Sequence, residues 1–433
     1  MKRREFLGTV IGASGATLLH SAEQPQLPPP GQSGIEHIVV VMMENRSFDH
    51  FLGWLPNANG KQAGLTYADP AGALQPTHEL APDFTGCGFN DPDHSYDGAR
   101  IEYDSGAMDG FLLNTANDIY SIGYYGRQDL RFLSAFALNY TTCDNFFPSI
   151  LGPTFPNRIF AWCAQTDRLD DSISFCTLPA IFDSLQQAGV SAKYYYSNIP
   201  ATLFFGLKYL GLTHTYDTFL QDAANGTLPA VSFVDPKYTT LDIFGTGNDD
   251  HPHADIRRGD AFVAQTFHAV ANSPNWPKTV FVLTRDEWGG FFDHVAPPRA
   301  AAPNNVDPDI VDGKTLLGIR VPVVVASPWS RGNPSNPRVN HLTYDHTSVL
   351  KMIEWRYGLA PLTARDASND IQNLALALNF SNPIAAVPAL PSPPSPGPAP
   401  CLSGPTSGLE KAQPTAWEQL RRSPLAYGWN LPE

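Results

Sequence analysis

Two clusters of oxygen-bearing side chains dominate the chemistry that this sequence could perform. Glu44 and Asn45 open the string ENRSFDH, and Asp286 and Glu287 open the string DEWGGFFDH. Carboxylate and amide groups supply hard oxygen ligands, which suit calcium, magnesium or manganese and suit zinc less well. Without a cation, carboxylates gathered at one point repel one another, and some become protonated. The clusters therefore predict that these four side chains hold one divalent metal ion.

An arginine close to each cluster gives an alternative interpretation. Arg46 follows Asn45, and Arg285 precedes Asp286. In this alternative the acidic side chains form salt bridges with the two arginines and have a structural role. Both strings are rich in carboxylates and both end in Asp-His, which favours a functional site over simple strand ends.

The string GPTFPNR, residues 152–158, offers a nucleophile at the start of a helix. A helix N-terminus binds phosphate through its free backbone amides and its dipole. A hydroxyl beside a divalent cation loses its proton more easily, so Thr154 could attack phosphorus. The string also has a structural interpretation, because Thr caps helices and Pro suits their first turn. Spacing alone does not separate nucleophile from cap, and only Arg158 lacks a structural explanation.

Histidines in two loops could complete such a site. His94 lies in DPDHSY, and His251 and His253 lie in NDDHPH, just before a predicted helix. A histidine near a transferring phosphoryl group can protonate the leaving oxygen or donate to equatorial oxygens. Lone loop histidines are usually only solvated, so each candidate needs support from position. For His294 and His346, each of which follows an Asp, we expect supporting roles.

Alternating strands and helices must position these residues. Apolar runs predict strands at 35–43, 191–196, 230–234, 279–284 and 321–327. Helical patterns lie between them at 156–165, 180–188, 255–271 and 344–357. This order predicts an α/β fold, a doubly wound, mostly parallel sheet with helices on both faces. Ligands of such sheets bind beyond the carboxyl ends of the strands, where both clusters fall.

The first residues predict export. Arg3 and Arg4 precede Phe6 and Leu7, a mild apolar stretch follows, and small residues end the segment near position 22. This pattern is typical of a twin-arginine signal, so we expect a periplasmic or secreted protein. The alternative is a basic N-terminal helix that stays attached.

The composition of the rest of the chain predicts a catalytic domain between two linkers, followed by a tail. Residues 23–34 form a predicted linker, and 35–386 form the predicted catalytic domain. The polar segment 53–114 is too long for an ordinary connection and predicts an active-site loop. Residues 387–408 are dense in Pro and predict a second linker. The tail, 409–433, has aromatic and apolar residues that predict docking onto the domain: Trp417, Leu420, Tyr427 and Trp429.

The net charge of −14 limits the choice of partners. Proteins that bind nucleic acid show basic clusters, which this chain lacks, so we expect no nucleic-acid partner. An anionic membrane surface would repel the chain at long range, which argues against permanent membrane residence but not against brief contact with lipids. The sequence does not predict an oligomeric state.

At these residues the sequence resembles a bacterial phosphoesterase family that contains secreted phospholipases C and an acid phosphatase, a branch of the alkaline-phosphatase superfamily. The resemblance rests on the stretches 35–55 (IEHIVVVMMENRSFDHFLGWL), 93–96, 152–158, 250–260, 284–297 and 344–358. The resemblance implies an α/β core and a covalent phospho-enzyme intermediate. It places five side chains around the metal: Glu44, Asn45, Thr154, Asp286 and Glu287.

The same resemblance implies roles for individual residues. Thr154 would be the nucleophile, and His94 and His251 would act on the phosphate or on the leaving group. His253 departs from the family pattern, which favours Pro there. The expected substrate is a phosphate ester, either a phospholipid or a small phosphoester.

Several functions stay open at this point. A phospholipase C-type phosphodiesterase is favoured, and an acid phosphatase acting on monoesters is the alternative. The spacing Thr154-x-Pro156-x-Arg158 also matches the sulfatase signature, but that chemistry needs Cys or Ser at the first position. A non-catalytic exported binding protein could use the same cation site.

Overall fold

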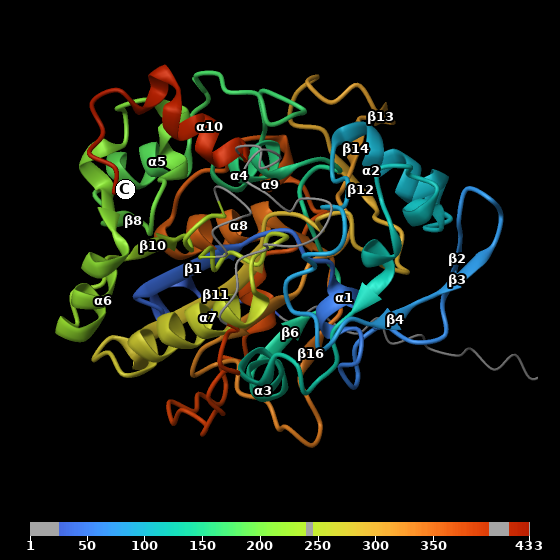
Figure 1. Ribbon diagram of the computed structural model, residues 1–433. Coiled ribbons are helices and arrows are strands. Elements are labelled where there is room, and N and C mark those ends of the chain that lie inside the picture. Colours follow the sequence, from blue (N-terminus) through green and yellow to red (C-terminus); the bar gives the residue numbers. More distant parts are fainter. Residues whose placement is uncertain (1–25, 240–245, 398–414, 433) are drawn as a thin grey trace, which may run out of the picture.

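The computed structural model describes residues 26–239, 246–397 and 415–432. The predicted export signal, 1–22, lies outside these ranges. An eight-stranded sheet runs through the middle of the molecule (Figure 1). Its strands lie in the order β16 (Val339–Asn340), β6 (Thr141–Cys143), β15 (Val323–Ala326), β11 (Thr279–Arg285), β1 (His37–Met43), β10 (Val231–Val234), β8 (Ala192–Tyr196) and β9 (Thr213–Thr215).

The central sheet is mostly parallel. Neighbouring strands run in the same direction except at β15, which is antiparallel to both β11 and β6. Strands buried on both faces read as continuous apolar runs, as β1 does. Each of the five predicted strands is present, so the predicted mostly parallel α/β sheet is confirmed.

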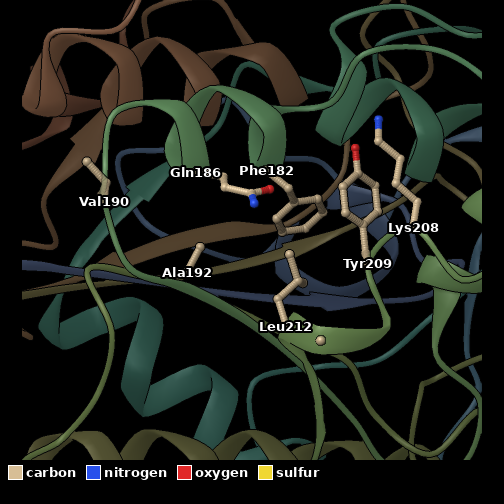
Figure 2. Close-up of a pocket in the computed structure, with 8 residues that line it drawn as sticks. Phe182, Gln186, Val190, Ala192, Lys208, Tyr209 and Leu212 are labelled. Carbon is tan, nitrogen blue, oxygen red and sulfur yellow. The ribbon is translucent and has the colours of Figure 1, made fainter.

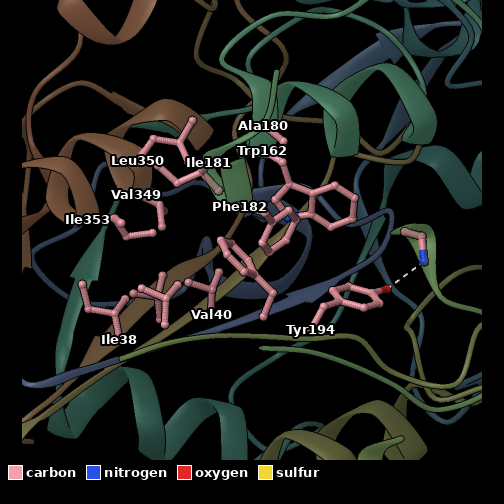
Figure 3. Close-up of a cluster of buried hydrophobic side chains, with 14 of the residues drawn as sticks. Ile38, Val40, Trp162, Ala180, Ile181, Phe182, Tyr194, Val349, Leu350 and Ile353 are labelled. Atoms are coloured by element: carbon pink, nitrogen blue, oxygen red, sulfur yellow. Dashed lines mark hydrogen bonds between the residues drawn. The ribbon is translucent and has the colours of Figure 1, made fainter. Parts of the chain in front are cut away.

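Helices cover both faces of the sheet. Alternate residues of a strand point to opposite faces. Ile38 and Val40 of β1 therefore pack with α4 (Thr154–Cys163), α5 (Ile181–Gln187) and α8 (His346–Tyr357), as Figure 3 shows. Val39 and Val41 pack on the other face with α3 (Arg131–Asn139), α6 (Tyr216–Asn225) and α7 (Ile256–Ala271). Four of these helices, α4, α5, α7 and α8, lie where the sequence predicts them.

Shorter elements connect this framework. The short helices are α1 (Phe48–Leu52), α2 (Tyr96–Tyr103), α9 (Ala364–Ala367) and α10 (Ala416–Arg422). The short strands are β2 (Thr66–Ala68), β3 (Leu74–Pro76), β4 (His78–Glu79), β5 (Gly123–Tyr124), β7 (Phe146–Phe147), β12 (Arg299–Ala301), β13 (Ile310–Val311), β14 (Lys314–Leu316) and β17 (Tyr344–Asp345). The long polar segment 53–114 therefore contains β2, β3, β4 and α2.

The C-terminal segment packs onto the main body. Trp417 and Leu420 of α10 are buried and join the core cluster that α4 and α5 share. Docking of the tail is thus confirmed for α10, whereas Tyr427 is 87% exposed. Within the described ranges, no helix combines the length and the apolar character needed to cross a bilayer.

Candidate active site

The carboxyl ends of β1 and β11 bring the two oxygen-rich clusters together. The strands are parallel neighbours, so the residues that follow them leave the sheet side by side. The backbone amide of Asn45 donates to Asp286 Oδ1 over 3.3 Å. The four side chains of the clusters are fully buried: Glu44, Asn45, Asp286 and Glu287. The structure thus gathers these residues at one end of the sheet.

A glycine allows this close approach. Gly289 has a φ of +67°, a backbone conformation that favours glycine. A Cβ atom at this position would lie 2.3 Å from the carbonyl oxygen of Asn45. A side chain there would push the two clusters apart.

Arg158 balances much of the negative charge. It lies one turn after Thr154 in α4 and is fully buried. Its Nε lies 2.9 Å from Asp286 Oδ2, and its Nη1 lies 3.1 Å from Asp235 Oδ1. Its Nη2 lies 3.4 Å from Glu44 Oε1. One guanidinium thus links the ends of β1, β10 and β11.

The alternative of salt bridges to Arg46 and Arg285 is wrong. Arg285 Nη2 pairs with Asp250 Oδ2 over 2.8 Å, and Arg46 Nε donates to Asp250 O over 2.8 Å. In the described parts of the chain, neither arginine forms an ion pair with Glu44, Asp286 or Glu287. The two arginines instead hold the loop that carries Asp250.

Three oxygens of the clusters are left without a hydrogen-bond partner. Glu44 Oε2, Asn45 Oδ1 and Glu287 Oε1 are buried and unpartnered among the described residues. Burial, together with the charge of Asp286, raises the pKa of Glu44 and Glu287 well above the usual range. Buried polar atoms without partners are costly, and carboxylate and amide oxygens are the ligands that a divalent cation of this kind prefers. The donor set therefore fits an oxygen-bound divalent metal ion.

His94 lies against this oxygen cluster. Burial lowers its pKa, but the carboxylates of Glu287 and Asp91 outweigh this effect and raise the pKa to about 10. In contrast, Asn45 Nδ2 lies 3.2 Å from His94 Nε2, and His94 Nδ1 lies 2.8 Å from Pro92 O. These contacts suit a neutral ring that accepts at Nε2 and donates at Nδ1. A protonated ring would donate at both nitrogens, and the charges of Glu287 and Asp91 favour that form.

His251 stands beside His94, as the sequence predicts for a shared site. The two rings meet edge to face with centroids 5.7 Å apart. His251 Nε2 lies 3.7 Å from Asp91 Oδ2. His253, in contrast, is 1% exposed, and its Nε2 donates to Phe89 O over 3.0 Å.

The two remaining histidines of interest lie elsewhere. His294 Nδ1 lies 2.5 Å from Asp49 Oδ2, in a group with Asp293 whose ligand atoms are close enough to hold a metal. Arg320 balances part of the negative charge of this group, at 3.3 Å from Asp49 and 2.9 Å from Asp293. The contact between Asp49 and His294 therefore links the string that follows β1 to the string that follows β11. His346 is buried, which lowers its pKa to about 4.

Thr154 is the first residue of α4. The N-cap position belongs to Pro153, whose side chain makes no capping hydrogen bond. The interpretation of Thr154 as a cap is therefore wrong. The next backbone amide, of Phe155, donates to Asp171 Oδ1 over 2.8 Å. Thr154 is 4% exposed and lies four residues before Arg158, which binds the carboxylates.

The pocket in Figure 2 lies away from this site. It has a volume of about 320 Å³ and is lined by residues such as Phe182, Tyr209 and Leu212. Lys208 on its rim pairs with Asp183 over 2.8 Å. The pocket contains none of the residues of the carboxylate clusters.

Sequence comparison identifies the family. The profile described as the Phosphoesterase family matches residues 35–360, which include both clusters, Thr154 and the two site histidines. The chain belongs to the phosphoesterase family. Its homologues are phospholipases C, so this phosphoesterase is a phosphoric ester hydrolase.

Three relatives illustrate the similarity. Phospholipase C B of Mycobacterium tuberculosis is 32% identical over 88% of this chain and 86% of its own. Non-specific phospholipases C1 and C6 of Arabidopsis thaliana are 34% and 33% identical, over 79% and 78% of this chain and 71% of each of theirs. A solved structure of an alkaline phosphatase superfamily protein from Vibrio parahaemolyticus aligns with a TM-score of 0.37 and 9% identity, covering 79% of this chain and 70% of that one.

Two acidic residues at the site of this phosphoesterase were not predicted from the sequence. Asp235 directly follows β10, so it carries the same signal as the two clusters, an acidic residue after an apolar strand. Asp171 lies in a loop with no distinguishing pattern. Burial raises its pKa to about 6, and its charge interacts with His94 and His251. Both residues contact α4, through Arg158 and the amide of Phe155.

Proposed function

We propose that this phosphoesterase hydrolyses phosphate esters in two steps with Thr154 as the nucleophile. In the first step, Thr154 Oγ1 forms a bond to phosphorus, and the bond between phosphorus and the alcohol oxygen breaks. Water then attacks the phosphothreonine, the bond to Thr154 breaks, and the phosphoryl group leaves with any remaining ester substituent. The amide of Phe155 already donates to Asp171, so α4 would contribute chiefly through its dipole, which favours negative phosphoryl oxygens at this end of the helix.

The unpartnered oxygens at the ends of β1 and β11 carry this proposal. Glu44, Asn45, Asp286 and Glu287 would hold one calcium, magnesium or manganese ion, with zinc less favoured, and Thr154 would lie beside it. When bound, the cation would lower the pKa of the hydroxyl and balance the charge of the phosphoryl oxygens. The family is typically metal-dependent, which agrees with this donor set.

The departing alcohol needs a proton, and His94 or His251 supplies it. Their rings adjoin one another beside the carboxylate clusters. An imidazolium in this position would donate its proton to the oxygen that leaves phosphorus. The charge of Asp91 favours the protonated form of His94, and Asp91 Oδ2 lies 3.7 Å from His251 Nε2.

A phosphodiester of the phospholipase C type is the favoured substrate. The support is the name phospholipase C, which the relatives share. Cleavage of a phospholipid would require brief contact with a membrane surface. The alternative is an acid phosphatase that acts on monoesters.

Hydrolysis of a phosphocholine diester and of a simple phosphate monoester by the purified full chain tests this proposal. Faster cleavage of the diester supports the phospholipase C type, and faster cleavage of the monoester supports the phosphatase. Thr154→Ala should abolish both activities while the fold is retained. A variant that keeps most of the wild-type rate would overturn the nucleophile, and no cleavage of either ester by the wild type would favour a binding protein.

Export is a separate proposal. The twin-arginine pattern of residues 1–22 supports a periplasmic or secreted location. Replacing Arg3 and Arg4 with lysine should retain the protein in the cytoplasm, as cell fractionation would show. Export of this variant at the wild-type level would contradict the proposal.

A further inference from the structure

A tryptophan from the C-terminal end of the chain contacts the proposed metal site. Trp417 lies in α10, beyond the residues 35–360 that the family profile matches. Its indole N–H donates to Glu44 Oε1 over 2.6 Å. The other oxygen of that carboxylate, Oε2, is one of the three buried atoms that lack a partner in the described part of the protein.

Packing fixes the position of the indole. Trp417 is 2% exposed, and its ring stacks on Tyr238 with centroids 3.8 Å apart and planes 12° apart. It meets the ring of Phe155 edge to face at 5.0 Å. The guanidinium of Arg158 lies 5.2 Å from its ring centroid. The indole thus contacts the residue that follows Thr154 and the arginine that balances the carboxylates.

The helix that carries Trp417 is anchored to the main body. Thr415, its N-cap residue, donates through Oγ1 to Thr239 O over 3.0 Å. Leu420 is fully buried, and α10 lies near α4 in Figure 1. These contacts hold the indole N–H at Glu44 independently of the carboxylate itself.

We propose that α10 completes the metal site and that Trp417 is a positioning residue for Glu44. The indole N–H holds Oε1 and thereby leaves Oε2 as the oxygen that is free to bind a cation. Without it, the 3.4 Å contact with Arg158 would be the one remaining polar contact of Oε1 among the described residues. Side chains that orient a metal ligand contribute about 10- to 100-fold to metal affinity. This inference rests on the proposed metal site.

Mn²⁺ affinity, measured by electron paramagnetic resonance on the metal-free full chain, tests the inference. Trp417→Phe keeps an aromatic ring against Tyr238 and removes the N–H donor. We expect it to weaken Mn²⁺ binding about tenfold or more. Trp429→Phe is the matched control, because the N–H of Trp429 has no partner within the described ranges. This control should bind Mn²⁺ like the wild type.

The outcomes separate the inference from the proposed function. Glu44→Gln should weaken Mn²⁺ binding more than Trp417→Phe. If Glu44→Gln binds normally, or if the wild type does not bind Mn²⁺, the metal site itself is wrong and the inference falls with it. If Glu44→Gln weakens binding and Trp417→Phe does not, only the positioning role is overturned.

A measurement on the wild type covers the case in which Trp417→Phe does not fold. Coupling between two sites is reciprocal, so Mn²⁺ binding must also stabilise the docked position of α10. Hydrogen–deuterium exchange within 416–422 should therefore slow when Mn²⁺ is added. Unchanged exchange in this helix, with binding confirmed by resonance, would overturn the inference.

Discussion

At the scale of single residues, Arg158 supplies the positive charge that allows several carboxylates to be buried close together. Its guanidinium contacts carboxylates that follow three different strands, and all of these groups lie inside the protein. A buried charge that loses its partner is expensive, because neither water nor another group replaces the lost interaction.

Replacing Arg158 should therefore destabilise the fold. We expect Arg158→Ala to lower the free energy of unfolding by about 3–5 kcal/mol, as measured by urea denaturation. Arg422→Ala is the control, because Arg422 forms a surface pair with Glu418 and its side chain is 64% exposed. The control should change stability by less than about 1 kcal/mol. Equal effects of the two variants would contradict the buried ionic network.

The loss of rate on removing either His94 or His251 should depend on the leaving group of the substrate. Removing a general acid slows the departure of a poor leaving group by about 10²- to 10⁴-fold. His94→Ala or His251→Ala should therefore slow cleavage of an alkyl phosphate ester strongly and cleavage of a nitrophenyl ester much less, since nitrophenolate leaves without a proton. Steady-state rates for both esters give, for each variant, the ratio of alkyl ester cleavage to nitrophenyl ester cleavage. A ratio that matches the wild type in both variants would exclude proton donation by these rings.

At the scale of elements, the contact between the strings that follow β1 and β11 depends on Gly289. Gly289→Ala should destabilise the protein by more than about 1 kcal/mol, because it adds a clash with the Asn45 carbonyl to an unfavourable φ. Gly313→Ala is the matched control, since Gly313 has a φ of +73° and no atom within 4 Å of its added Cβ. Thermal unfolding should show a larger loss of stability for Gly289→Ala than for Gly313→Ala. Equal losses would show that the close approach of Gly289 to the Asn45 carbonyl does not matter for stability.

The packing of α8 against α9 should make stability depend on pH. Burial, assisted by Asp366, raises the pKa of Glu354 from 4.5 to about 9. Because the folded-state pKa lies above the unfolded one, this contribution to stability is complete below pH 4.5 and is lost as the pH rises through 9. The loss has a slope of up to about 1.4 kcal/mol per pH unit. Glu354→Gln should remove this slope from denaturation curves, whereas the exposed Glu79→Gln should not.

The main helices and strands could be predicted because the residue patterns that indicate them lie within short stretches of the sequence. Continuous apolar runs marked β1 and β11, and helical stretches between the predicted strands marked α7 and α8. The carboxylate clusters could be placed at one edge of the sheet because both follow predicted parallel strands, whereas the adjacency of β1 and β11 comes from the structure. The edge strands β9 and β16 are too short to leave such a pattern, so the sequence did not predict them.

At the scale of the whole molecule, the site joins segments that are far apart in the chain. Arg158, Asp235 and Trp417 meet near Glu44, and only the fold brings them together. No spacing within the sequence could pair Arg158 with its carboxylates, and the nearby Arg46 and Arg285 gave the wrong partners. The docking of the tail could be predicted from its apolar residues, but its contact with Glu44 could not.

The stereochemical course at phosphorus shows whether Thr154 or water attacks the substrate. A phosphodiester made chiral at phosphorus by oxygen isotopes would be hydrolysed by the full chain, and the configuration of the product would be determined. Attack by Thr154 and then by water inverts the configuration twice, so we expect net retention. Net inversion would mean that water attacks the substrate directly, and it would contradict Thr154 as the nucleophile.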